Sequence, residues 1–132
     1  MSVDILIVDD EKDARESLQD ILELEDYEVD VVATGDEALK KLNKGEYVLM
    51  FLDFKLPGVD GLEVMQQTHL LYPETKIIIL TAHGSLDSAI EAIRCGVHDY
   101  LLKPFEAESL LASVEACFTA RVERQQKELL VQ

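Results

Sequence analysis

The sequence predicts an α/β fold, a doubly wound, five-stranded parallel sheet with the pattern (βα)5. Short runs rich in β-branched residues alternate five times with longer segments of helical periodicity. Such alternation is typical of a parallel sheet with helices on both faces and right-handed crossovers. The third and fourth runs are apolar almost throughout, as expected for central strands that helices cover on both sides. A chain of 132 residues, 48% of them hydrophobic, is enough for one such domain.

The predicted strands are short runs in which aliphatic and β-branched residues dominate, which favours extended backbone. In chain order they are Val3–Val8, Val29–Ala33, Tyr47–Leu52, Lys76–Leu80 and Tyr100–Leu102.

The predicted helices follow the strands and carry apolar residues three and four positions apart, on one face each. They cover Asp13–Leu24, the segment from Thr34 to about Gly45, Gly61–Leu71, Ser85–Cys95 and a segment that starts near Glu106. Thr34 to Glu37 has the pattern of a capping box, and Gly96 is suited to end the fourth helix.

The chain changes character after Phe118, since residues 121–132 are mostly polar. Their apolar residues are Val122, Leu129, Leu130 and Val131. We therefore expect one domain over residues 1–120 and a C-terminal continuation of the last helix, or a linker, over residues 121–132. A coiled coil and a solvated tail both remain open for this segment.

The formal net charge of −15 disfavours direct contact with nucleic acid or with an anionic membrane surface. The first ten residues have neither the basic nor the apolar region of a signal peptide. No apolar run is longer than about six residues, whereas spanning a bilayer takes about 18. We expect a cytoplasmic protein in which Cys95 and Cys117 are free thiols.

Polar residues follow four of the five predicted strands. Asp9 and Asp10 follow the first, Asp53 the third, Thr81 the fourth and Lys103 the fifth. Ligands of open parallel sheets bind outside the carboxyl ends of the strands. Three close carboxylates need a counterion, for which Mg²⁺ with its preference for oxygen ligands is suited. A hydroxyl and an ammonium at such a site suit phosphoryl oxygens.

The sequence contains neither of the common nucleotide-binding loops, G-x-x-x-x-G-K-[ST] and G-x-G-x-x-G. A phosphoryl group can still be handled if a carboxylate takes it covalently. Asp53 is the candidate nucleophile, because it stands alone at the end of a central apolar strand.

Four motifs, ILIVDDE, FLDFKLPGVDGLEV, IIILTAHG and DYLLKPF, resemble those of two-component response-regulator receiver domains. The resemblance covers residues 3 to about 120 and implies a flavodoxin-like sheet with strand order 2-1-3-4-5. It also implies that Asp53 is the phospho-acceptor and that Asp10 is a direct Mg²⁺ ligand. Asp9 would help to hold the metal, commonly through water, and the backbone carbonyl of Lys55 would complete the protein ligands.

The same resemblance implies that Thr81 and Lys103 contact the phosphoryl oxygens and that Tyr100 is a switch aromatic. In this family the bond between Lys103 and Pro104 is usually cis. The stretch LTAHGSLDSAIEAIRCGVHDYLLKPF resembles receivers of sigma-54-dependent transcription activators. Their ATPase and DNA-binding domains do not occur in this chain, which is either a piece of a longer protein or a stand-alone regulator.

The implied function is a signalling switch that takes a phosphoryl group from a sensor histidine kinase. The domain would catalyse its own phosphorylation, from phosphohistidine or small phosphodonors, and its own dephosphorylation. The expected output is control of transcription through an altered homodimer or partner interface. Lys55 and His83 fall where the family tunes phosphoryl lifetime, although a solvated lysine and a plain loop histidine are the simpler interpretations.

Three alternatives remain at this point. A pseudo-receiver would bind partners without phosphorylation, but the complete set of acids, threonine and lysine argues against it. A phosphoaspartate hydrolase would typically need D-x-D-x-T after the first strand, whereas the acids here are adjacent. A purely structural module would leave the converging charges unexplained.

Overall fold

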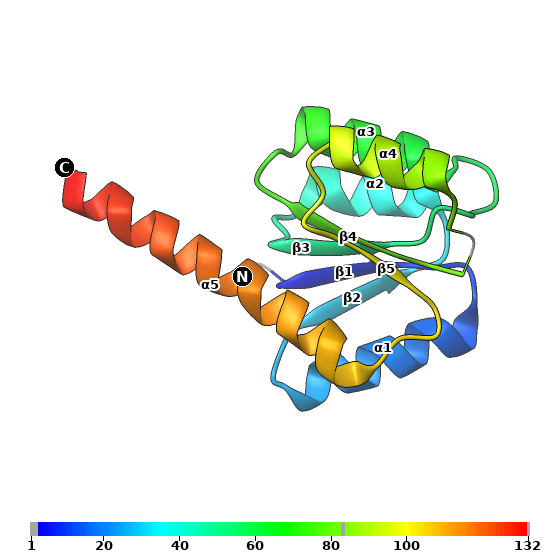
Figure 1. Cartoon of the computed structure of the whole chain (residues 1–132), viewed down its shortest axis with the longest axis horizontal. Coiled ribbons are helices and arrows are strands. Elements are labelled where there is room, and N and C mark those ends of the chain that lie inside the picture. Colours follow the sequence, from blue (N-terminus) through cyan, green and yellow to red (C-terminus); the bar gives the residue numbers. More distant parts are fainter. Residues whose placement is uncertain (1–2, 83, 132) are drawn as a thin grey trace.

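The computed structural model describes residues 3–82 and 84–131, and it is a sheet between two layers of helices (Figure 1). The sheet has five parallel strands in the order β2-β1-β3-β4-β5. They are β1 (Ile5–Val8), β2 (Val29–Val32), β3 (Leu49–Leu52), β4 (Lys76–Thr81) and β5 (Asp99–Leu102). The predicted fold class and strand order are both confirmed.

Helices cover both faces of the sheet. They are α1 (Lys12–Leu24), α2 (Gly35–Lys44), α3 (Gly61–Leu71), α4 (Leu86–Arg94) and α5 (Ala107–Val131). Figure 1 shows α2, α3 and α4 on one face and α1 and α5 on the other. Right-handed crossovers produce this distribution, because the direction in which the chain winds reverses at the neighbouring strands β1 and β3.

The central strands are buried on both faces, and their residues alternate between two cores. In β1, Leu6 and Val8 join the core beneath α2, α3 and α4, whereas Ile5 and Ile7 join the core beneath α1 and α5. All four of these residues have exposed fractions of 1% or less. The near-continuous apolar runs of the sequence therefore reflect burial on both sides of a sheet.

Two strands start later than predicted, at Ile5 and Leu49 rather than at Val3 and Tyr47. The amides of Val48 and Leu49 both donate to the Asp4 carbonyl, at 3.0 and 3.2 Å. Because two amides share this one acceptor, the regular hydrogen bonding between β1 and β3 begins only after it.

The capping box predicted at the start of α2 has one of its two expected hydrogen bonds. The Thr34 hydroxyl oxygen accepts the Glu37 N–H at 3.2 Å, but the Glu37 carboxylate accepts from the Thr34 hydroxyl instead of from the Thr34 amide. A reciprocal capping box occurs at α4, between Ser85 and Ser88. Gly96 follows Cys95, the C-cap residue of α4, and has a φ of 68°, the left-handed conformation expected of a glycine that ends a helix.

The last helix is 25 residues long and continues well past the sheet (Figure 1). Its first half packs on the sheet through Leu110, Val114 and Cys117, whereas Val122 and Leu129 are exposed. In the outer half, the Arg124 guanidinium donates to the Glu74 carboxylate at 2.8 Å.

None of the helices between residues 3 and 131 combines the length and the hydropathy needed to cross a bilayer.

Both cysteines are free thiols, as predicted. Cys117 is buried and Cys95 is half-buried.

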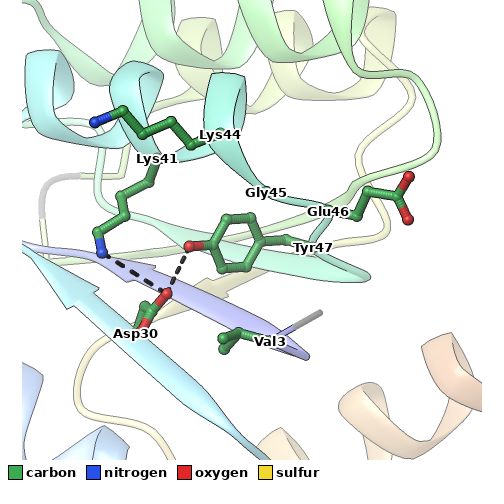
Figure 2. Close-up of a pocket in the computed structure, with 7 residues that line it drawn as sticks. All are labelled: Val3, Asp30, Lys41, Lys44, Gly45, Glu46 and Tyr47. Carbon is green, nitrogen blue, oxygen red and sulfur yellow. Dashed lines mark hydrogen bonds and ion pairs between the residues drawn. The ribbon is translucent and has the colours of Figure 1, made fainter. Parts of the chain in front are cut away.

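A polar cluster lies near the amino ends of β1 and β3, at the opposite end of the sheet from the predicted site. The Tyr47 hydroxyl donates to Asp30 at 2.6 Å, and the Lys41 ammonium lies 3.9 Å from the same carboxylate oxygen (Figure 2). Burial raises the pKa of Tyr47, and the hydrogen bond and charge of Asp30 raise it further. The pocket there, about 430 Å³, is lined by Val3, Asp30, Lys41, Lys44, Gly45, Glu46 and Tyr47. None of the predicted site residues belongs to it.

Candidate functional site

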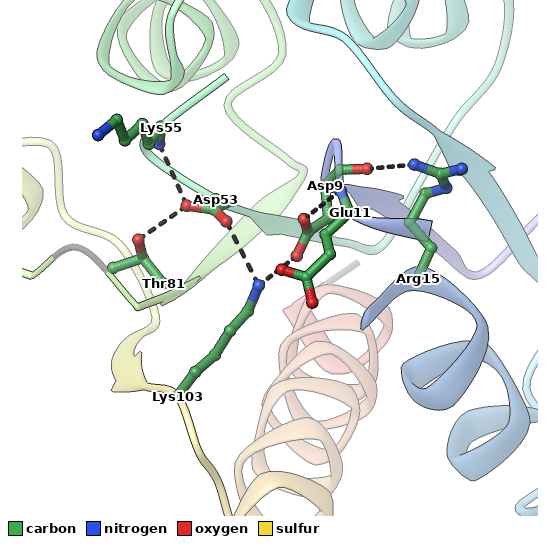
Figure 3. Close-up of polar contacts among 7 residues, drawn as sticks. All are labelled: Asp9, Glu11, Arg15, Asp53, Lys55, Thr81 and Lys103. Atoms are coloured by element: carbon green, nitrogen blue, oxygen red, sulfur yellow. Dashed lines mark hydrogen bonds and ion pairs between the residues drawn. The ribbon is translucent and has the colours of Figure 1, made fainter. Parts of the chain in front are cut away.

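The predicted site residues meet at the carboxyl edge of the sheet. Asp9, Asp53 and Lys103 each come directly after a strand, and Thr81 is the last residue of β4. Because these parallel strands are neighbours, their carboxyl ends open onto the same place, where the side chains point toward one another (Figure 3).

Asp53 is buried, with an exposed fraction of 5%, and both of its carboxylate oxygens have partners. Its Oδ1 accepts a hydrogen bond from the Thr81 hydroxyl at 2.7 Å and one from the Lys55 backbone N–H at 3.1 Å. Its Oδ2 accepts one from the Lys103 ammonium at 3.3 Å. A buried carboxylate is stable here because charge-assisted hydrogen bonds replace its water.

Lys103 bridges two buried acids. Its Nζ lies 2.5 Å from Asp9 Oδ2 and 3.3 Å from Asp53 Oδ2, and 17% of its side chain is exposed. Burial by itself lowers the pKa of Lys103, but the hydrogen bond and charge of Asp9, together with the charge of Asp53, raise it above its ordinary value. The ammonium is therefore retained at neutral pH. The bond between Lys103 and Pro104 is cis.

The three acids could hold a divalent cation. Asp9, Asp10 and Asp53 each offer a carboxylate oxygen, and these oxygens lie within 4.8 Å of one another. Asp9 and Asp53 are buried, whereas Asp10 is exposed at the mouth of the site. Three carboxylates against one ammonium leave negative charge uncompensated, and an all-oxygen set open to water suits Mg²⁺, which keeps several of its waters. The residues present therefore fit this ion.

Glu11 follows the two adjacent acids at the start of α1. Its side chain is exposed, and it is the N-cap residue of α1 without a side-chain capping bond. Its backbone N–H donates to Asp9 Oδ1 at 3.0 Å. Glu11 therefore contributes its backbone, rather than its carboxylate, to the arrangement of the acids.

Tyr100 lies on the side of the sheet that α4 covers and is half-buried. Its hydroxyl lies 2.7 Å from the Ser88 hydroxyl, and its ring centroid is 6.0 Å from that of Phe54. The residue therefore contacts the N-terminal turn of α4 and the loop after β3. The partnership with Ser88 was not predicted, because no local pattern joins a strand residue to a helix residue twelve positions earlier.

The sequence also contained no clear indication of a role for Arg15. Its guanidinium donates to the backbone carbonyl of Asp9 at 2.9 Å. A polar residue on the half-buried side of the first helix was the only available signal.

Within the described residues, neither His69 nor His98 makes a hydrogen bond or ion pair with the acids of the site. A ring nitrogen of His98 lies 2.9 Å from the Ser113 carbonyl oxygen, which is a structural contact, and His69 is exposed. His83, the other residue at a position where the family tunes phosphoryl lifetime, lies outside the described residues. Lys55 is exposed.

A family profile described as the response regulator receiver domain matches residues 5–115, which include every predicted site residue. The chain belongs to this receiver domain family. A receiver domain is the phospho-accepting switch of a response regulator, and this is the function of the chain. Receiver domains catalyse their own phosphorylation and dephosphorylation, bind Mg²⁺ at an acidic pocket and take their phosphoryl group from histidine kinases.

Curated relatives of this receiver domain include the response regulator protein FleR of Pseudomonas aeruginosa, 38% identical over 111 residues. The nitrogen assimilation regulatory protein NtrX of Azorhizobium caulinodans is 37% identical over 132 residues. The alignments cover 84% and 98% of this chain but only 24% and 29% of the relatives. The predicted resemblance to receivers of sigma-54-dependent activators is thereby confirmed. This receiver domain spans about a quarter of the length of these relatives.

The fold of this receiver domain also matches solved structures. A CheY-like receiver domain protein from Methanospirillum hungatei has a TM-score of 0.85 at 34% identity, with 97% of this chain and 99% of that chain covered. The response regulator TrrA from Thermotoga maritima, solved with Mg²⁺ and a beryllium fluoride, has a TM-score of 0.79 at 37% identity over 87% of this chain and 98% of that chain.

Proposed function

We propose that Asp53 is the residue that takes the phosphoryl group. The observation that carries this proposal is the pairing of one buried carboxylate with a hydroxyl, from Thr81, and an ammonium, from Lys103. These are the groups that a phosphoryl group on Asp53 would meet. In a phospho-acceptor, a carboxylate oxygen bonds to phosphorus while the phosphorus–nitrogen bond of a phosphohistidine breaks, and its electron pair stays on the imidazole.

The proposed metal ligands are Asp9, Asp10, Asp53 and the backbone carbonyl of Lys55. The proximity of the three carboxylates supports the first three, and the Lys55 carbonyl rests on the family resemblance. When bound, Mg²⁺ would offset charge on the transferring oxygens. The Lys103 ammonium, which contacts both Asp9 and Asp53, would offset such charge as well. Phosphoryl transfer depends mainly on such positioning and charge stabilisation. Attack of water in line with the acyl phosphate then returns the free carboxylate.

The proposed switch comprises Thr81 and Tyr100. A phosphoryl group adds charge of about −1.5 to −2 and new acceptor oxygens. The Thr81 hydroxyl now donates to Asp53 and would donate to the phosphoryl group instead. Its movement would leave space for the Tyr100 ring to turn inward, and the Tyr100 hydroxyl would then release Ser88 at the start of α4.

The face formed by α4 and β5 is the proposed interface for a second copy or a partner protein. It carries exposed apolar side chains from both elements, with exposed fractions of 77% for Leu86, 76% for Ile93 and 56% for Leu102. Single exposed apolar residues are ordinary, but several on neighbouring elements mark an interaction site.

Residues 1–120 are the proposed switch unit, and residues 121–132 are proposed to lead as a helix or linker toward an output domain of a longer protein. The expected phosphodonor is a sensor histidine kinase, the expected output is transcription, and the expected location is the cytoplasm. The matched region makes up only 24% and 29% of these two relatives, which supports an output domain elsewhere.

The test is the intact mass of the protein after incubation with acetyl phosphate and Mg²⁺. We expect the wild-type protein and the control Asp20→Asn, in which an exposed acid of α1 is neutralised, to gain one phosphate, and Asp53→Asn to gain none. If the wild-type protein gains no phosphate from acetyl phosphate or from a kinase, the phosphorylation-independent alternative replaces this proposal. A shift in size with beryllofluoride would identify dimer formation.

A further inference from the structure

We propose that Arg15 is a positioning residue that fixes the peptide between Asp9 and Asp10 and thereby directs the Asp10 carboxylate to the metal site. This inference rests on the proposed function, because it assigns a role to the acids as cation ligands. Figure 3 shows the Arg15 side chain reaching back from α1 to the Asp9 carbonyl, on the side of Asp9 away from Lys103.

The contact acts on the backbone rather than on a carboxylate. The Arg15 Nη1 donates to the Asp9 carbonyl oxygen at 2.9 Å, and this oxygen belongs to the peptide that joins Asp9 to Asp10. The amide on the other side of Asp9 donates to the Val32 carbonyl at 3.2 Å. The backbone of Asp9 is therefore held at both ends, once by the sheet and once by Arg15.

The side chains of the two adjacent acids differ in how they are held. Asp9 is fixed through both carboxylate oxygens, by the Glu11 N–H at 3.0 Å and by the Lys103 ammonium at 2.5 Å. The Asp10 carboxylate has no hydrogen bond or ion pair to any residue of the described ranges 3–82 and 84–131, and it is exposed. Its direction toward Asp9 and Asp53 therefore depends on the backbone that carries it, and Arg15 holds the peptide on one side of that backbone.

Arginine suits this task because of where it starts and how far it reaches. Arg15 lies in the first turns of α1, where its own amide donates to the Glu11 carbonyl at 3.0 Å. Its planar guanidinium gives a donor of fixed direction, whereas a lysine would offer a mobile point charge. Groups that orient metal ligands typically change metal affinity 10- to 100-fold when removed.

The sign of the effect separates positioning from simple electrostatics. The Arg15 guanidinium is a cation close to an acidic site. By Coulomb repulsion alone, its removal would therefore strengthen the binding of a metal cation at that site. A positioning role predicts the opposite, a weaker affinity for the metal. Lys12 is a matched control, because it lies at the start of the same helix with 76% of its side chain exposed and pairs only loosely with Glu16, at 3.8 Å.

The experiment measures Mn²⁺ binding to the whole chain by the electron paramagnetic resonance signal of free Mn²⁺. We expect Arg15→Met to raise the Kd for Mn²⁺ about tenfold and Lys12→Met to leave it within about twofold of the wild-type value or slightly lower. With acetyl phosphate, Arg15→Met should need about tenfold more Mg²⁺ for its half-maximal rate but should approach the wild-type rate when Mg²⁺ saturates.

An unchanged or lower Kd for Arg15→Met would overturn the inference, as would a rate that stays low at saturating Mg²⁺. If circular dichroism shows that Arg15→Met is unfolded, Arg15→Gln makes the same test, since its side chain is too short to reach the Asp9 carbonyl. Should the wild-type protein bind Mn²⁺ without becoming phosphorylated, the proposed function fails, and the role of Arg15 is still decided by the binding measurement.

Discussion

Neutralising the proposed phospho-acceptor should stabilise the metal-free protein. In Asp53→Asn, the amide oxygen can still accept from the Thr81 hydroxyl and the Lys55 N–H, so both hydrogen bonds to Oδ1 remain. The change removes one of three clustered negative charges. It also ends one of the two ion pairs of Lys103, whose shorter contact is with Asp9.

The balance of these charges gives the magnitude. The carboxylate oxygens of the three acids lie at most 4.8 Å apart. With an effective dielectric constant of about 20, like charges at this largest separation repel by about 3.5 kcal/mol, and opposite charges 3.3 Å apart attract by about 5 kcal/mol. Asp53 faces two acids and one ammonium, so its neutralisation favours the folded protein by about 2 kcal/mol. Because water screens the exposed Asp10, we expect a gain of about 1 kcal/mol, or about 4 °C in Tm.

The assay is urea unfolding followed by circular dichroism, first in EDTA and then in Mg²⁺. In EDTA, Asp53→Asn should be more stable than the wild-type protein, and the control Asp20→Asn should differ from it by less than about 0.5 kcal/mol. Mg²⁺ at about 100 times its Kd should add about 2.7 kcal/mol to the wild-type protein and less to the variant, which reverses the order. If Asp53→Asn is no more stable than Asp20→Asn in EDTA, repulsion among the three acids does not outweigh the ion pair between Asp53 and Lys103, and the reasoning is refuted.

Three further predictions concern other contacts. The single variants Ser88→Ala and Tyr100→Phe and the double variant should give a coupling free energy of about 1 kcal/mol by urea unfolding, and additive losses would show that the hydroxyls do not interact in solution. Tyr47 has a raised pKa in the folded protein, so above about pH 10 the unfolded chain loses this proton first and stability falls as pH rises. Tyr47→Phe should therefore lose less stability than the wild-type protein between about pH 9 and 11, and parallel pH curves would contradict this account. A Cβ at Gly61 would lie 2.4 Å from backbone atoms of the loop after β3, so Gly61→Ala should lose about 1–3 kcal/mol and slow phosphorylation. Gly45→Ala is the control, because its Cβ would meet no atom closer than 3.7 Å, and equal losses in the two variants would reject the steric argument.

The layers of the fold and the members of the acidic cluster could be predicted from the sequence. Successive side chains of a strand point to opposite faces of the sheet, so Leu6 and Ile7 lie in different cores. The spacing of apolar residues along each helix likewise indicates which of its faces is buried. Asp9 and Asp53 could be assigned to one site because each follows a parallel strand, and parallel strands end at the same edge. Alternation along a strand, apolar spacing along a helix and the place of an acid after a strand each involve residues only a few positions apart, so they can be recognised in the sequence.

The pairing of groups within the site could not be predicted from the sequence, because it depends on the packing of distant segments. Lys103 and Asp9 are 94 positions apart, and the strand order brings both to one edge of the sheet, where the ammonium lies closer to Asp9, at 2.5 Å, than to Asp53, at 3.3 Å. The reach of Arg15 to a backbone carbonyl and the contact of Tyr100 with Ser88 likewise depend on how the helices rest on the sheet. Hydrogen bonds form over about 3 Å, so a small shift of a helix changes the partner while leaving the local sequence pattern the same.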